Sequence, residues 1–236
     1  MKKLLACTSL LLTAQLAMAD IPPSDYLAYS DQLIREYHLL SNAPLPQVEI
    51  LGPQLLHSQP PLPTLAAQYI REGDAFKKRD IEMAITRTLQ SRLNGAPSRY
   101  VSFLYTLHLA PYDIDRRRFG VCFERECLDR RPYPIHTKLG TERYELAISD
   151  APNRILFSPE EAVARQLEAV AAKFGRRTPA LLVVEVTSTE EKQWSDKTPY
   201  RRVLSKLVGI QFLADFPRDP RSAPSAEAVL YSIWEK

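Results

Sequence analysis

Glycine is scarce in this sequence, with seven residues in a chain of 236. The glycines are dispersed, so there is no Gly-rich loop whose backbone amides would cradle a phosphate, which disfavours nucleotide-binding scaffolds of that kind. The chain also lacks the Gly-x-Ser-x-Gly turn of serine hydrolases and the His-Glu-x-x-His helix of zinc proteases. No motif identifies a reaction, and we expect no cofactor.

Histidine and cysteine are also rare, with four and three residues respectively. No histidine pairs with another histidine or with a cysteine at the spacing of metal ligands, so we predict no metal site. Each histidine is more typical of a surface or hydrogen-bonded residue than of a base. The four are His38, His57, His108 and His136.

Excess charge and long apolar runs are missing as well. Thirty-one basic residues face 28 acidic ones, so the net charge is no reason to expect a nucleic-acid partner. No stretch after residue 19 reaches the roughly 18 apolar residues of a transmembrane helix, and we expect no integral membrane segment after that point. The composition does not indicate an oligomeric state.

What the chain does have is an N-terminal segment typical of a secretory signal peptide. Lys2 and Lys3 precede an apolar stretch over residues 4–16, and Ala17-Met18-Ala19 places small residues before Asp20. We expect cleavage near Ala19 and a mature protein in the periplasm, in a Gram-negative bacterium. The formal charge then falls from +3 to +1, because 29 basic and 28 acidic residues remain.

Cleavage at this position changes the cysteine count. Cys7 is removed, and Cys122 and Cys127 remain as an even pair, which favours a disulfide in an oxidising compartment. Four residues separate them, whereas redox-active pairs have two, so we interpret the bond as a structural staple. Lipidation at Cys7 is disfavoured because only three residues separate it from Lys3.

The periodicity of apolar residues predicts an α+β fold with a mainly antiparallel sheet packed with helices, preceded by an N-terminal helix and a proline-rich segment. We expect that proline-rich segment to be extended, as a surface spacer rather than a docking peptide. The predicted division is a signal peptide (1–19), an N-terminal helix with a proline-rich linker (20–63) and an α+β domain (64–236) that could split into two subdomains near 150. The expected helices are 24–41, 64–94 with a break at 73–74, and 158–175; the expected strands are 101–109, 119–123, 144–149, 154–157, 182–186, 204–214 and 229–234.

The densest polar cluster directly follows the strand that ends at residue 109. Asp113 and Asp115 would share one face of an extended chain, where they could divide acid and base roles with His108 in a hydrolase. Arg116, Arg117 and Arg118 favour a simpler interpretation, in which the carboxylates pair with arginines in a solvated turn. Another interpretation groups these arginines with others in an anion-binding patch. The others are Arg130, Arg131, Arg201 and Arg202.

Three hypotheses about function follow from these residues. The first is an exported, non-catalytic protein that binds or helps to assemble another component of the cell envelope, through sheet edges or through the charged segment 189–202, where Trp194 and Tyr200 could contact a protein partner. The second is a periplasmic hydrolase that uses His108 with Asp113 or Asp115. The third is an anion-binding carrier that uses Arg116, Arg117 and Arg118.

Overall fold

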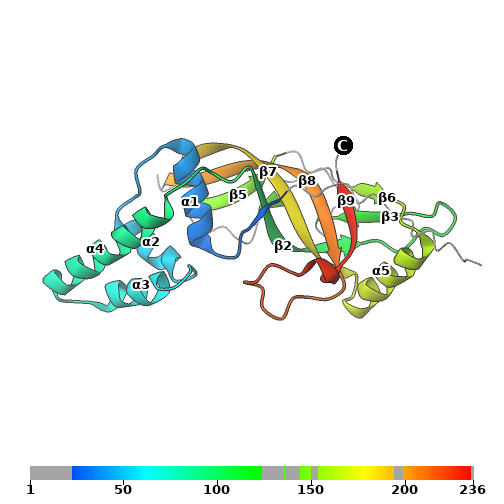
Figure 1. Ribbon diagram of the computed structural model, residues 1–236, viewed down its shortest axis with the longest axis horizontal. Helices are drawn as coiled ribbons and strands as arrows, with labels where there is room; N and C mark the ends of the chain where they lie inside the picture. The colour runs from blue at the N-terminus through cyan, green and yellow to red at the C-terminus, as the bar shows by residue number, and fades with distance from the viewer. Residues whose placement is uncertain (1–22, 124–134, 137–143, 150–153, 194–198, 235–236) are drawn as a thin grey trace, which may run out of the picture.

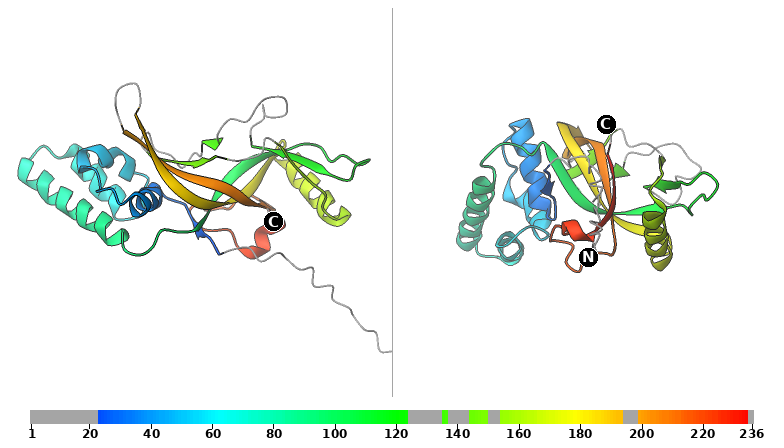
Figure 2. Two further views of the ribbon diagram at one scale, coloured as in Figure 1. Left: turned by 90° about the horizontal axis from the view of Figure 1, so that it is seen from above. Right: turned by 45° about the vertical axis from the view of Figure 1, so that its right-hand side comes forward.

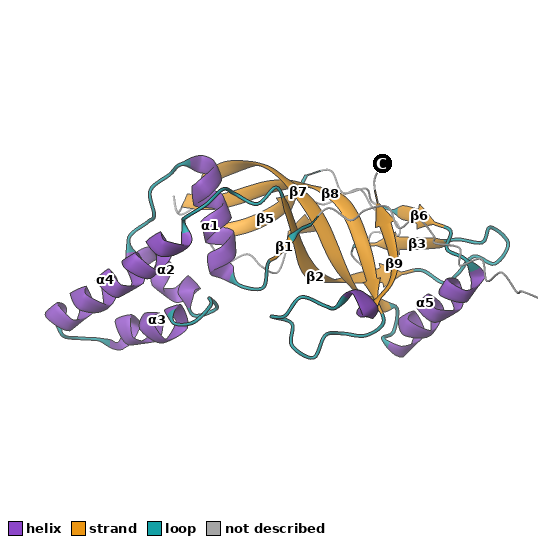
Figure 3. Cartoon of the chain, in the orientation of Figure 1, coloured by secondary structure: helices purple, strands orange, loops and turns teal. Residues whose placement is uncertain are grey.

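A computed structural model describes residues 23–123, 135–136, 144–149, 154–193 and 199–234. Four helices gather at one end of the molecule, a curled sheet occupies the middle, and a fifth helix lies at the other end (Figures 1 and 3). The helices are α1 (Ser30–Ser41), α2 (Val48–Leu55), α3 (Leu62–Arg71), α4 (Ala75–Arg92) and α5 (Glu161–Lys173), with a 3-10 turn at Ala226–Ala228. The strands are β1 (Asp25–Tyr26), β2 (Tyr100–Leu109), β3 (Phe119–Cys122), β4 (Ile135–His136), β5 (Tyr144–Ile148), β6 (Ile155–Phe157), β7 (Arg177–Gln193), β8 (Pro199–Leu213) and β9 (Val229–Trp234).

The α+β class is confirmed, but the sheet is mixed rather than mainly antiparallel. Its path runs β4-β5-β8-β7-β2-β3-β6, with β1 beside β2 and β9 beside β8. The pairs β1–β2 and β5–β8 are parallel. Strand direction depends on the connections: α5 and β7 lie between β5 and β8 in the chain, a crossover long enough to return the chain in the same direction. Apolar periodicity carries no information about that choice.

Strand β2 follows its predicted alternation closely. Val101, Phe103, Leu107 and Leu109 are buried on one face, as expected for a strand with one strongly apolar side. The curl of the sheet brings aromatic rings from separate strands into contact inside it. The ring of Phe157 in β6 stacks on those of Phe119, Phe212 and Tyr231 at centroid distances of 5.5, 5.1 and 5.5 Å.

The two tail strands are much longer than predicted. β7 and β8 form one hairpin that pairs from Ala180 opposite Phe212 to Gln193 opposite Pro199. The charged segment 189–202, which we expected to be exposed, belongs mostly to this hairpin. The side chains of Arg201 and Arg202 are only 14% and 12% exposed, because α1 and β5 pack against this end of the hairpin. Cross-strand ion pairs with acidic residues of β7 allow these arginines to be buried.

The proline-rich stretch is largely helical, so the expectation of an extended segment is wrong. α2 carries Pro53 in its interior, and α3 accommodates Pro63 in its first turn. Proline is well tolerated in a first turn, where the amide hydrogen has no partner within the helix. The apolar residues between the prolines decide the outcome, since Leu51, Leu55 and Leu62 are fully buried.

Two helices, α1 and α5, begin later than the sequence predicted. α1 begins at Ser30, later than expected, and the side chain of Gln32 accepts hydrogen bonds from the amides of Ala28 and Tyr29. α5 begins at Glu161 rather than at Ser158. The predicted break at 73–74 is confirmed, because the Asp74 carboxylate accepts two amide hydrogen bonds at the start of α4.

Among the described helices, none has the length and the apolar composition needed to cross a membrane.

Candidate functional site

The arginine-rich cluster after β2 forms a closed turn at the α5 end of the molecule. The amide of Asp113 donates to the carbonyl of Arg118 at 2.9 Å, and the reverse bond is 3.1 Å. Inside the turn, the carboxylate of Asp113 accepts from the amide of Arg116 at 3.0 Å. Such side-chain bonds to the following backbone are the reason why aspartate favours turns. Arg117 has a left-handed backbone, with φ of 50°.

Helix α5 holds this turn in place through one carboxylate. Glu168 accepts two hydrogen bonds from the guanidinium of Arg176, at 2.9 and 2.5 Å, and a longer one of 3.4 Å from the amide of Tyr112. The bond from Arg176 holds the pKa of Glu168 below its ordinary value, so this carboxylate is charged at neutral pH. Arg176 itself has φ of 69°, and its amide donates to the carbonyl of Ala171 at 2.6 Å just after the end of α5.

A cleft of about 950 Å³ lies between the turn and the first part of α5. Its volume is within the range of ligand-binding clefts. Ile114, at the tip of the turn, is 79% exposed over it, whereas Ala164 on the helix is buried. The residues that line it are Tyr112, Ile114, Arg117, Ser158, Pro159, Glu160, Glu161, Ala164, Arg165 and Glu168.

Charges of both signs line this cleft, since Arg117 and Arg165 stand beside Glu160, Glu161 and Glu168. Arg165 contacts Glu161 at 2.6 Å, and this hydrogen bond lowers the pKa of Glu161. Arg116 belongs to the turn but does not line the cleft, and it approaches the carboxylate of Asp113 at 3.7 Å. The walls of the cleft therefore combine apolar surface with fixed charges of both signs rather than with a concentrated positive charge.

The residues of the hydrolase hypothesis are not among those that line this cleft, and they do not have the arrangement expected. His108 is near the end of β2, in register with Cys122 and Arg177 of the neighbouring strands. Asp113 and Asp115 do not share a face of an extended strand, because residues 114–117 form the turn. Asp113 is bonded within that turn to Arg116. A catalytic role for these residues stays a prediction.

The arginines of the proposed anion patch lie at opposite ends of the sheet. Arg118 bonds within the turn beyond β2, and β2 itself pairs at Leu107 with Thr178 of β7. Arg201 pairs with Glu191 of β7. The stretch of β7 from Thr178 to Glu191 spans roughly 40 Å if it is extended. The hairpin therefore separates Arg201 and Arg202 from the turn; Arg130 and Arg131 lie outside the described residues.

The structure describes only some of the remaining predicted residues. Cys122 is fully buried in β3, and Cys127 lies outside the described residues, so their disulfide stays a prediction. Trp194 also lies outside them. Tyr200 is half-buried in β8, in register with Lys192.

The structure also assembles a polar cluster that sequence reasoning missed. Nε2 of His38 in α1 lies 2.7 Å from the hydroxyl of Tyr144 in β5. The guanidinium of Arg201 lies 5.9 and 5.7 Å from the ring centres of Tyr37 and Tyr144. Glu191 contacts Arg201 at 3.2 Å. Burial raises the pKa of Tyr144 above its ordinary range, so its hydroxyl remains protonated and can donate.

No spacing rule could have found this cluster. Its residues come from α1, β5, β7 and β8, and His38 and Tyr144 are 106 positions apart in the chain. The rings of His38 and Tyr144 are almost completely buried. We interpret the cluster as a polar contact through which α1 packs against the sheet and the hairpin.

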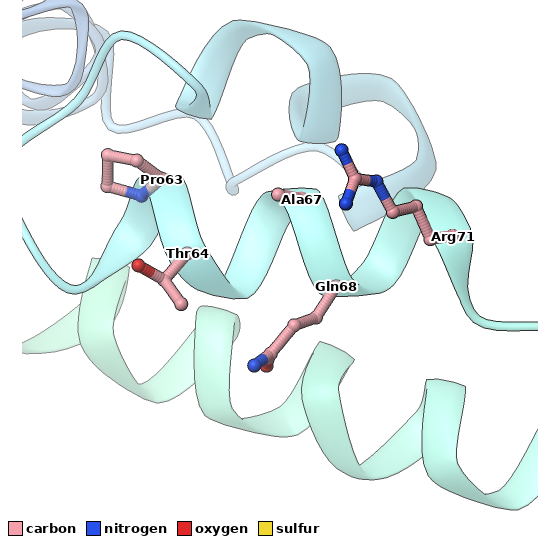
Figure 4. A pocket seen from close by; sticks show the side chains of 5 residues that line it. All are labelled: Pro63, Thr64, Ala67, Gln68 and Arg71. Carbon is pink, nitrogen blue, oxygen red and sulfur yellow. The ribbon is translucent and has the colours of Figure 1, made fainter.

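A shallow depression also lies on α3 (Figure 4). Its volume is about 420 Å³, and Pro63, Thr64, Ala67, Gln68 and Arg71 line it. All of these residues belong to one helix, so the depression lacks an opposite wall that would orient a ligand.

Within the described ranges, no group of three His, Cys, Asp or Glu side chains lies close enough together to hold a metal ion. No family model matches the sequence, and neither a curated protein nor a solved structure matches it.

Proposed function

We propose that this protein is exported to the periplasm, where it is a non-catalytic component of the cell envelope that binds a segment of another protein. The observation that carries the proposal is the cleft between the 112–118 turn and α5, with its exposed Ile114 and its charged walls. The signal-peptide pattern of residues 1–19 supports the location.

The chemistry of the cleft favours a polypeptide over a simple anion. An anion carrier would gather cations away from acidic groups, whereas here Arg165 contacts Glu161, and Glu160 and Glu168 also line the cleft. A polypeptide segment offers apolar side chains, charges of both signs and backbone polar groups together, which matches these walls. The hydrolase remains the second candidate, supported only by the nearness in sequence of His108 to the turn.

Photo-crosslinking from the cleft tests the proposal. A photoreactive residue at Ile114 should capture one defined protein in the envelope of intact cells, because this exposed side chain overhangs the cleft. The matched control is a photoreactive residue at Phe76, which is 82% exposed on α4 at the other end of the molecule (Figure 2). The captured partner should appear from position 114 and not from position 76.

Binding of the captured partner then provides a quantitative test. Ile114→Lys should weaken it about tenfold, which corresponds to about 1.4 kcal/mol. The substitution should leave thermal unfolding unchanged, because the side chain is mostly solvated. Equal capture from both positions, or unchanged affinity of Ile114→Lys, would show that the cleft is not the binding site.

A further inference from the structure

Arg117 occupies a position in the turn where the backbone favours glycine. Its φ of 50° lies in the left-handed region, in which the Cβ of any other residue approaches the following carbonyl oxygen. The turn holds this conformation, because Asp113 and Arg118 exchange two backbone hydrogen bonds and the Asp113 carboxylate accepts from the amide of Arg116. The backbone therefore gives no reason for an arginine at position 117, and its side chain is a candidate for function.

The side chain of Arg117 lines the cleft without a close partner there. Its guanidinium forms no hydrogen bond and no ion pair with any described residue. The hydrogen bond from Arg165 is the main cause that lowers the pKa of Glu161, and the charge of Arg117 adds a smaller part from a longer distance. Arg165 itself already donates twice to Glu161, at 2.6 and 3.2 Å. Of the two arginines that line the cleft, Arg117 is therefore the one that can donate to a ligand.

The surroundings of Arg117 favour a carboxylate next to an apolar group. Ile114, on the same wall of the cleft, is 79% exposed, so the turn offers an apolar contact beside a guanidinium. The planar guanidinium matches carboxylate and phosphate groups equally well in shape. Three glutamates line the same cleft, and they would repel a doubly charged phosphate more strongly than a carboxylate with a single charge.

We propose that Arg117 determines which polypeptide the cleft binds, by pairing with an aspartate or glutamate that stands next to an apolar residue in a partner protein. Ile114 then contacts that apolar residue. This inference rests on the proposed function, since it gives a side-chain preference to the polypeptide in the cleft. A second copy of this chain is disfavoured as the partner, because a symmetric contact through the cleft would bring the arginines 116–118 of both copies together.

Selection from a phage-displayed library of random peptides tests this inference. The full mature protein is the target, and the peptides of interest are those that Ile114→Lys no longer binds. They should carry an aspartate or a glutamate beside an apolar residue, and selection on Arg117→Glu should instead yield lysine or arginine at that place. Peptides that depend on Ile114 but lack an acidic residue would overturn this inference and leave the proposed function standing. A selection without any such Ile114-dependent peptide would overturn both.

Variants of the turn measure the contribution of Arg117 to binding of one selected peptide. Arg117→Gly should weaken the peptide about tenfold, which corresponds to about 1.4 kcal/mol. It should not lower the unfolding midpoint, because glycine suits a φ of 50°. The matched control is Arg116→Gln, which should bind normally because Arg116 does not line the cleft. Equal weakening by both variants would overturn the inference, since the effect would then belong to the general charge of the turn.

Two further measurements separate this ligand from other occupants. Sodium acetate and inorganic phosphate at equal ionic strength should compete equally weakly with the peptide, and selective displacement by phosphate would overturn the inference. Sedimentation of the free chain measures self-association. A dimer that Arg117→Glu dissociates would also overturn the inference, because the occupant would then be a second copy.

Discussion

His38 is a single residue whose ionisation reports on the packing of the helical end. Its Nδ1 lies 2.9 Å from the carbonyl of Ala43 and its Nε2 lies 2.7 Å from the Tyr144 hydroxyl. A carbonyl can only accept, so Nδ1 carries the hydrogen and Nε2 accepts from Tyr144. Burial is the main cause that lowers the pKa of His38 below its ordinary value of 6.5, and the nearby cation of Arg201 adds to it. The Ala43 bond and Glu191 act in the opposite direction.

This environment predicts a specific pH dependence of stability. The unfolded chain binds a proton at His38 near pH 6.5, whereas the folded protein resists it, so the contribution of His38 is complete above that pH and is lost as the pH falls below it. Urea unfolding from about pH 7.5 to about pH 5.5 should show a greater loss of stability in the wild type than in His38→Gln. Parallel losses in the two proteins would mean that His38 is solvated.

At the scale of elements, Arg92 joins three helices. From the end of α4 it forms an ion pair with Asp31 in the first turn of α1, and it donates to the carbonyls of Gln59 and Pro60 before α3. The Asp31 side chain is only 2% exposed. The α-helical end therefore depends on a buried ion pair as well as on its apolar contacts.

Removing this cation should destabilise the fold strongly. Arg92→Met should cost about 3 kcal/mol, because it leaves the buried Asp31 carboxylate without its cation. Chemical denaturation measures the loss, and a second substitution, Asp31→Asn, should recover part of it. The control is Arg165→Met, which removes an exposed helical ion pair and should leave the unfolding midpoint at the wild-type value. A similar effect of Arg92→Met and Arg165→Met would contradict the buried-pair argument.

The elements also illustrate where periodicity predicts structure and where it fails. The alternation in β2 and the apolar stripe of α5 report local geometry, and both elements form where expected, apart from the start of α5. The proline-rich stretch is helical because three buried leucines stabilise it, and their burial depends on helices elsewhere in the chain. Strands β7 and β8 were predicted only in their apolar halves, because cross-strand pairing, rather than alternation, stabilises their charged halves.

For the whole molecule, export makes a prediction about the covalent state of the chain. Protein isolated from the envelope should start near Asp20 and should have no free thiol, because the proposed cleavage would remove Cys7 and the predicted disulfide would join Cys122 to Cys127. Intact mass with alkylation before and after reduction measures both properties. A chain that starts at Met1, or that alkylates without reduction, would contradict the export proposal. Closure of so small a loop should contribute about 2 kcal/mol at most.

The sequence by itself determined the leader pattern, the α+β class, the position of most strands and the absence of known reaction motifs, since each depends on the order and the type of neighbouring residues. Tertiary structure decided what requires distant segments to meet. The curled, mixed sheet separates Arg201 from the turn at Asp113, and it brings Tyr144 to His38. The cleft lies where the turn after β2 meets α5, and the Glu168 carboxylate accepts there from the Tyr112 amide. Such contacts depend on the path of the whole chain, which local periodicity does not encode.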